Sequence, residues 1–205
     1  DKFSRYLGRN PEGRGSLEAQ ALLPIELASG FPSGQLDALR DWARRIVAGD
    51  GLVPVSALMT RLEGQVGPKL ARRQLTDAAD VLARIGFGLA PDPRFALRAP
   101  RLDEPVVLFE LPQPVARLED VGEEFRSGLL QIALGCVVAQ ADGQVSPDEE
   151  RALRAQLDEI AGLTEVERIM LKANLDWFLA VPPDMVQLRG RMKEVGTGQE
   201  ENLRR

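Results

Sequence analysis

The first half of the chain carries the pattern of three helices, because apolar residues recur every three or four positions in three stretches. In the first stretch Leu39, Ala43 and Ile46 share one face, and a Gly-Asp-Gly sequence ends the helix. Residues that favour an extended chain follow, and Ser56 is then expected to cap the second helix. The predicted elements are helices over 36–48, 56–62 and 70–85 and an extended stretch over 52–55.

Two short runs of β-prone residues follow the third helix. They are Phe87 to Ala90 and Val106 to Leu111, and a loop with four prolines joins them. Helix, short strand, helix, helix and two-stranded ribbon is the order of a winged-helix module, although several other small α+β folds share it. We therefore predict a small winged-helix-like α+β module over 36–111.

Four further helical patterns occupy the second half of the chain. The first, Glu123 to Ala141, is apolar almost all round, so we expect it to be the central and most buried helix. Two more begin with capping boxes, Ser146 with Glu149 and Thr164 with Glu167, which satisfy the free backbone N–H groups of a helix start. The predicted helices cover 123–141, 147–161, 165–180 and 184–195.

The fold class predicted from these patterns is mainly α, a C-terminal helical bundle preceded by the winged-helix-like module. The chain begins at Asp1 without a methionine or a signal-peptide pattern, so we expect a piece of a longer protein. The predicted divisions are an arm or linker over 1–35, the module over 36–111, a linker over 112–122, the helical domain over 123–195 and a tail over 196–205.

Composition removes most catalytic schemes. The chain has no histidine and one cysteine, which excludes His/Cys zinc sites, Ser-His-Asp triads and internal disulfides. That residue, Cys136, lies in an apolar stripe and is expected to be an inert, buried thiol. No Gly-rich phosphate loop appears, so we expect no enzyme. The longest apolar run, Leu129 to Ala141, is too short to span a bilayer, and a reducing cytoplasm is the expected location.

Charge differs between the two halves of the chain. The net charge is −5 overall, but residues 36–100 carry ten Lys or Arg against seven Asp or Glu, a balance of +3. Residues 102–195 carry nine against eighteen, a balance of −9. This asymmetry indicates two modules with different surfaces, unless both are simply solvated faces.

A short turn between two predicted helices, Ala141 to Glu149, has the pattern ADGxVSxxE. With the preceding LLQIALGCVVAQ and the two helices after it, this turn resembles the tellurite-resistance TerB-like family; the upstream GFGLAPDPRF and EPVVLFELP resemble the connecting segment of multidomain TerB proteins. The family's second Asp-Gly turn is not found before Arg205, so we expect only the first half of the repeat. The positions that match the family turn are Asp142, Gly143, Ser146 and Glu149.

The resemblance implies an all-helical, non-enzymatic domain tied to tellurite resistance, chemical stress and phage defence. It also implies binding of a divalent cation or of a partner through acidic residues. A protein partner is therefore the main expectation.

The same turn resembles part of a calcium loop of the EF-hand type, with Asp142 at loop position 5 and Glu149 at position 12. Positions 1 and 3 would be Val138 and Gln140 inside the preceding helix, so a true EF-hand is rejected. The remaining hypothesis is that calcium or magnesium binds Asp142, Ser146, Asp148 and Glu149, with further ligands from Glu150 or another helix.

Helix initiation alone also explains the turn, because Glu149 stands three residues after a capping Ser146 with Pro147 at the first helical position. Against that, the helical wheel places Glu149 on the same face as Leu153 and Leu157, and an inward carboxylate needs a partner. Asp142 could likewise only accept N–H groups of its own turn.

The preferred function is a binding or scaffold module. The alternative is nucleic-acid binding through the winged-helix-like part, in which basic residues at the start of the third helix and in the wing contact phosphates. Its weakness is that +3 is slight and that the −9 module would repel phosphate. The residues assigned to this alternative are Lys69, Arg72, Arg73, Arg94 and Arg98.

Overall fold

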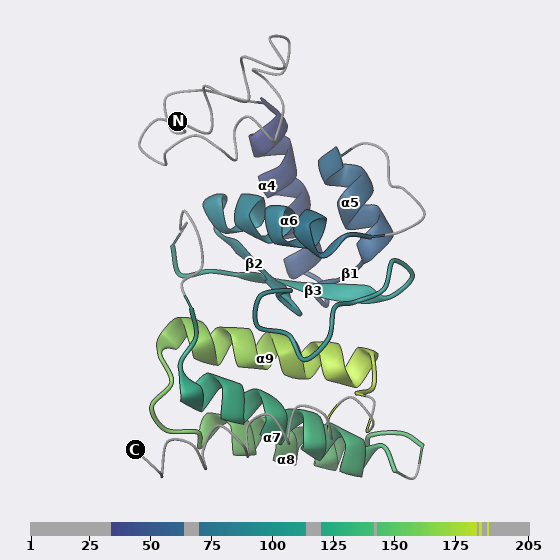
Figure 1. Ribbon diagram of the computed structural model, residues 1–205, viewed down its shortest axis with the longest axis vertical. Coiled ribbons are helices and arrows are strands. Elements are labelled where there is room, and N and C mark those ends of the chain that lie inside the picture. Colours follow the sequence, from purple (N-terminus) through teal and green to yellow (C-terminus); the bar gives the residue numbers. More distant parts are fainter. Residues whose placement is uncertain are drawn as a thin grey trace.

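The computed structural model describes residues 34–63, 70–113, 120–141, 143–183, 185 and 188. This part of the chain is mainly helical and contains a small three-stranded antiparallel sheet. Figure 1 shows the elements in layers, with α4, α5 and α6 above the sheet, α9 directly below it, and α7 and α8 at the bottom. The elements in order are α4 (Gly34–Val47), β1 (Leu52–Pro54), α5 (Val55–Glu63), α6 (Arg72–Arg84), β2 (Phe87–Ala90), β3 (Pro105–Glu110), α7 (Glu123–Ala139), α8 (Pro147–Asp158) and α9 (Glu165–Ala180).

The predicted helices and strands within the described residues are all found, with differences at their ends. α7 ends at Ala139 and α8 at Asp158, both earlier than predicted. α5 begins at Val55, so Ser56 lies inside the helix and does not cap it. Instead the N–H groups of Val55 and Ser56 donate to carbonyl oxygens of the β2–β3 loop, at 3.0 and 3.2 Å. The expected arm, the tail and most of the helix over 184–195 lie outside the described residues.

The predicted two-stranded ribbon is part of a three-stranded sheet, because β1 pairs with β3 in the order β1-β3-β2. β3 is the central strand and is buried on both faces. Val106 and Leu108 belong to the apolar core beneath α4, α5 and α6, whereas Val107 and Phe109 belong to the core formed with α7, α8 and α9. One sheet thus separates two cores and is needed by both.

Gly88 in β2 lies opposite Phe109 in β3 and leaves room for its ring. A Cβ atom built at Gly88 would lie 2.0 Å from Phe109 Cζ and 2.2 Å from Cε2. Cε1 would lie 2.7 Å away, so the outer end of the Phe109 ring stands over this position. The absence of a side chain at Gly88 therefore leaves space for the Phe109 ring, which belongs to the core formed with α7, α8 and α9.

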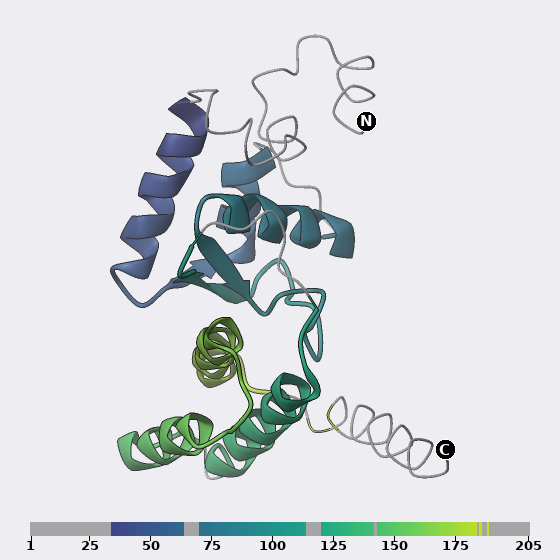
Figure 2. The ribbon, with the colours of Figure 1, turned by 90° about the vertical axis from the view of Figure 1, so that its left-hand side faces the viewer.

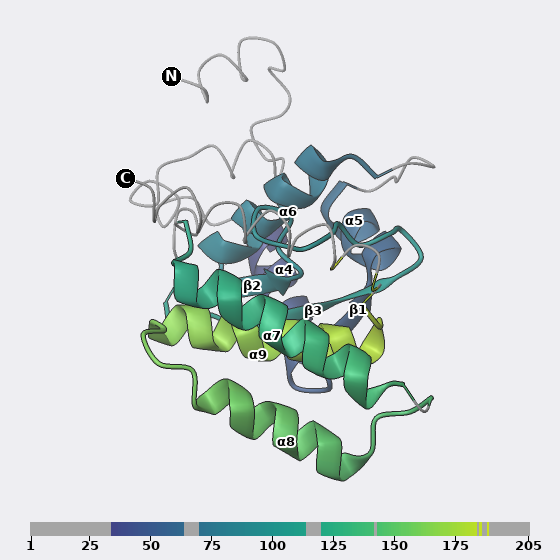
Figure 3. The ribbon, with the colours of Figure 1, turned by 60° about the horizontal axis from the view of Figure 1, so that its bottom comes forward.

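The central helix is α9, not α7 as the apolar pattern predicted. α9 lies between the sheet and the other two C-terminal helices (Figures 2 and 3), and seven of the nine residues from Met170 to Phe178 are buried. Trp177 Nε1 also donates a hydrogen bond of 2.9 Å to the carbonyl oxygen of Pro105 in β3. α7 buries one face only, and Val138 on its other face is 74% exposed.

Cys136 on α7 is fully buried, as predicted, and burial raises the pKa of its thiol to about 12. The thiolate is therefore negligible at neutral pH.

Over the ranges that the structure describes, no helix has both the length and the apolar composition needed to cross a membrane.

Candidate functional site

The turn between α7 and α8 holds the residues for which the sequence predicted a cation site. Ser146 and Glu149 form a complete capping box: the Ser146 N–H and Oγ lie 2.8 and 2.7 Å from Glu149 Oε2, and the Glu149 N–H donates to Ser146 Oγ at 3.3 Å. These hydrogen bonds hold the pKa of the Glu149 carboxyl below its ordinary value. The capping prediction is confirmed.

Besides Ser146 and Glu149, Asp148 is the one predicted ligand that the structure describes. The Glu149 side chain is partly exposed and turned along the surface to the cap, so the expected core-facing position is wrong. Asp148 forms an ion pair with Arg151 of the same helix. Asp142 lies outside the described residues, and among those that are described no group of three or more His, Cys, Asp or Glu could hold a metal ion. Glu149 Oε1 carries no hydrogen bond of the cap.

The second predicted capping box extends beyond its own helix. Glu167 Oε2 accepts from the N–H and Oγ1 of Thr164, both at 2.9 Å, while Oε1 accepts from the N–H of Gly122 at 2.8 Å. Gly122 is the N-cap residue of α7 and has no side chain to cap that helix. Partial burial pushes the pKa of Glu167 up, but the hydrogen bonds from Gly122 and Thr164 outweigh it and hold the pKa below its ordinary value. One carboxylate thus joins the starts of α7 and α9, which the sequence did not indicate.

Two of the arginines assigned to nucleic-acid binding lie in the β2–β3 loop and form ion pairs within the protein. The Arg94 guanidinium is 11% exposed and pairs with Asp92 at 2.6 Å and with Asp80 of α6 at 2.8 Å. Arg98 is 19% exposed and donates to both carboxylate oxygens of the buried Glu104, at 2.6 and 2.9 Å. Its guanidinium also lies 4.9 Å from the centre of the Trp177 ring.

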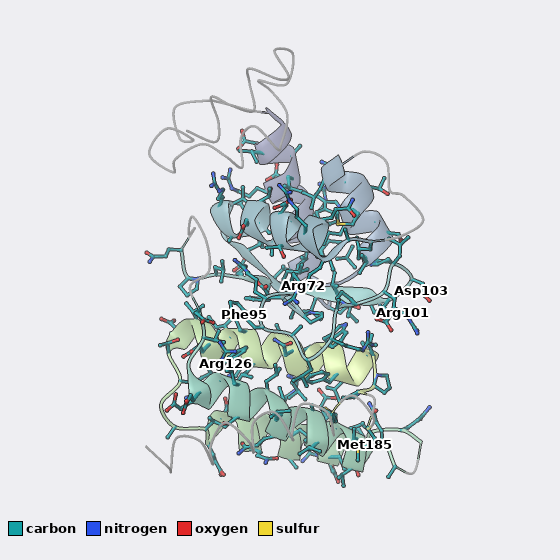
Figure 4. The ribbon with its side chains drawn as sticks, in the orientation of Figure 1. Arg72, Phe95, Arg101, Asp103, Arg126 and Met185 are labelled. Carbon is teal, nitrogen blue, oxygen red and sulfur yellow. The ribbon has the colours of Figure 1, made fainter. Side chains whose placement is uncertain are left out.

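The basic residues at the start of α6 differ in their exposure and in their internal partners. Arg72, labelled in Figure 4, donates through Nε and Nη2 to the carbonyl oxygen of Pro93 at 3.1 and 2.7 Å. Arg73 is 91% exposed and pairs only loosely with Asp77, at 3.7 Å. Lys69 lies outside the described residues. The structure therefore does not bring these residues together with Arg94 and Arg98 as one open basic surface.

Every cationic side chain described within 120–183 has an internal partner. Arg126 and Arg151 pair with acids near them in sequence, and Arg154 joins Glu150 to Asp176. Lys172 pairs with Asp158, and Arg168 donates to carbonyl oxygens at the end of α8. No described cation of α7, α8 or α9 is left over to neutralise further acids.

Unpaired acids gather at one end of the three C-terminal helices, where α7 and α9 begin and α8 ends. The Glu124 side chain lies between two glycines of this end: a Cβ atom at Gly122 would be 3.1 Å from its Oε2, and one at Gly162 would be 3.0 Å from its Cγ. Arg126, labelled in Figure 4, marks the same end. We call this surface the acidic end; its exposed acids without an ion-pair partner among the described residues are Glu123, Glu124, Glu159 and Glu165.

The acidic end lies opposite the ADGxVSxxE turn, because α8 runs from that turn to the acidic end. At the turn itself, the described acids Asp148, Glu149 and Glu150 each have a partner. Only the count of 102–195, with its balance of −9, pointed to the excess of acidic residues.

Comparison of the chain with protein-family models, with curated proteins and with solved structures gave no match.

Proposed function

We propose that this chain is a non-enzymatic binding module of a tellurite-resistance or stress and phage-defence system, and that it binds a basic protein partner through the acidic end. The carrying observation is the charge arrangement of α7, α8 and α9. Their described cations are all paired internally, while Glu123, Glu124, Glu159 and Glu165 are exposed and have no ion-pair partner among the described residues. Such a surface attracts a positively charged partner and speeds its association. The TerB-like turn supplies the assignment to that system.

Calorimetric titration of the intact chain with a lysine-rich peptide tests this proposal. The variant E123Q/E124Q/E165Q removes three acids of the acidic end, and D37N/D41N/D77N removes three exposed acids of α4 and α6 as a control of equal charge. At roughly 0.5 kcal/mol per exposed pair, the first variant should bind about tenfold more weakly. The control should bind like the parent chain. Equal weakening in both variants would show only general attraction to net charge and would reject the acidic end as the site.

The proposal also includes a divalent cation at the ADGxVSxxE turn, supported by Glu149 Oε1, which takes no part in the capping box. Calcium or magnesium at millimolar concentration should then raise the melting temperature, because a ligand of the folded state stabilises it by mass action. Asp142→Asn and Glu149→Gln should each abolish the rise. Glu167→Gln, in the capping box without an Asp-Gly turn, should retain it. An unchanged melting temperature and no heat of binding would dispose of the cation.

The second candidate is nucleic-acid binding by a winged-helix-like module over 36–111. The strand order β1-β3-β2 supports this fold, and the exposed Arg73 at the start of α6 is the observation that favours the function. Against it, Arg94 and Arg98 are held in internal ion pairs, and Asp77 and Asp80 lie on α6 itself. The test requires the intact chain, since residues 36–111 alone would expose Val107 and Phe109 of the shared sheet.

A further inference from the structure

α8 is held less firmly than the two helices beside it. Of its twelve residues only Leu153 and Leu157 are buried, whereas α7 and α9 bury seven each. Figures 1 and 3 show it at the edge of the molecule, away from the sheet and beside α7 and α9. Leu153 packs against bare backbone, because a Cβ atom at Gly135 of α7 would lie 2.5 Å from Leu153 Cδ2. Few apolar side chains of α8 therefore hold it against α7 and α9.

The ion pairs between α8 and α9 are made by side chains that are partly exposed to solvent. Arg154 Nη2 lies 2.6 Å from Asp176 Oδ1, and Lys172 Nζ lies 3.0 Å from Asp158 Oδ1. These four side chains are between 37% and 57% exposed. Arg168 of α9 adds hydrogen bonds of 3.0 to 3.3 Å to carbonyl oxygens at the end of α8. Dissolved salt screens such exposed ion pairs.

A glycine with a positive φ lies on each side of α8. Gly143 and Gly162 have φ values of 112° and 79°, which glycine adopts without strain. α8 begins with its own cap, Ser146, and α9 begins with Thr164. Moving α8 away from α7 and α9 therefore breaks neither capping box.

We propose that α8 is a lid, which opens away from α7 and α9 while the sheet and the other helices stay folded. The ionic ties to α9 set how often it opens. Opening uncovers the face of α7 around Gly135 that Leu153 covers when the lid is closed. A detached helix of twelve residues is marginal in water, so the open lid exchanges its amide hydrogens with solvent.

Amide hydrogen exchange on the intact chain, at about 50 mM and about 500 mM sodium chloride, tests the lid. Arg154→Gln removes the ion pair to Asp176 of α9 together with one to Glu150 within α8, whereas Arg151→Gln, its matched control, removes only an ion pair within α8. Amides of α8 should exchange faster than those of α9 and β3, and faster again in high salt. Arg154→Gln should accelerate the α8 amides about two- to fivefold, the range expected for one exposed ion pair, and leave β3 unchanged. Arg151→Gln should have less than half that effect.

Exchange of α8 at the same rate as α9 and β3 would show that the helix opens only when the whole protein unfolds, which overturns the proposal. Equal effects of the two arginine variants, or none of salt, would overturn the part assigned to the ionic ties. A general rise in exchange caused by Arg154→Gln would appear in β3 too and would also count against a separate lid.

Discussion

At the scale of single residues, the two capping boxes have the same local hydrogen bonds, but the glutamate of one also bonds a second helix. Among the described residues, Glu149 accepts hydrogen bonds from Ser146 alone, while Glu167 accepts from Thr164 and also from the N–H of Gly122, 45 positions earlier in the chain. Helix caps follow from a four-residue pattern and are visible in a sequence. A hydrogen bond to another helix depends on where the fold places that helix, so no local pattern reveals it.

Glu167→Gln should destabilise the protein by about 1 kcal/mol, because it weakens a charged hydrogen bond between α7 and α9. Glu149→Gln, the matched control, should destabilise it less. The folded-state pKa of Glu167 is lowered, so its contribution is present above the unfolded pKa of about 4.3 and is lost as pH falls through the folded value. Urea unfolding at pH 7 and pH 3 measures both effects. The explanation fails if the two variants are equally stable at pH 7, or if Glu167→Gln loses as much stability on acidification as the parent chain.

Gly88→Ala should destabilise the protein by about 1–3 kcal/mol, the usual cost of overpacking a core, since the new methyl group would meet the Phe109 ring. In a chain that already carries Phe109→Leu, Gly88→Ala should destabilise the protein less than it does in the parent chain. Urea unfolding of the four proteins gives the coupling. Purely additive effects would mean that the ring does not occupy the space above Gly88.

At the scale of the elements, α9 stabilises both of its neighbouring layers and α7 only one. Leu171 on α9 is fully buried, so Leu171→Ala should cost about 2–5 kcal/mol. Val138→Ala on the exposed face of α7 should stay within about 0.5 kcal/mol. Thermal unfolding compares the two directly. A large loss at Val138 would mean that this face of α7 is covered in solution, for example by a second copy.

Apolar periodicity and caps were enough to predict the elements, because both act within a few residues. The start of α9 at Glu165 and the strand Phe87–Ala90 were predicted to the residue. Periodicity was misleading about which helix is central, because Glu123 to Ala141 is apolar in composition while burial depends on where the sheet packs. Arg94 and Arg98 were assigned to an open wing for the same reason, since their partners Asp80 and Glu104 are brought close only by the folded loop.

At the scale of the whole molecule, the two modules predicted from the sequence share one sheet. Val106 and Leu108 face the first core while Val107 and Phe109 face the second, so neither core is complete without β3. Trp177 of α9 is also hydrogen-bonded to Pro105 of β3. We therefore expect both halves to unfold together, apart from local opening of α8.

The two tryptophans test this expectation, since Trp42 lies in α4 and Trp177 in α9. In the variants Trp42→Phe and Trp177→Phe, the remaining indole reports on one half. Its fluorescence should follow the same urea transition as the far-ultraviolet circular dichroism of that variant. A fluorescence transition that precedes the circular dichroism in either variant would show two independently stable halves.

Binding through the acidic end, rather than binding of nucleic acid, is tested most directly by fluorescence anisotropy. The intact chain is titrated in parallel into a labelled lysine-rich peptide and a labelled DNA duplex, at about 50 and about 200 mM salt. We expect binding of the peptide, weakened by salt and by E123Q/E124Q/E165Q, and no binding of the duplex. Salt-dependent binding of the duplex that Arg73→Gln weakens, with no binding of the peptide, would contradict the proposed function.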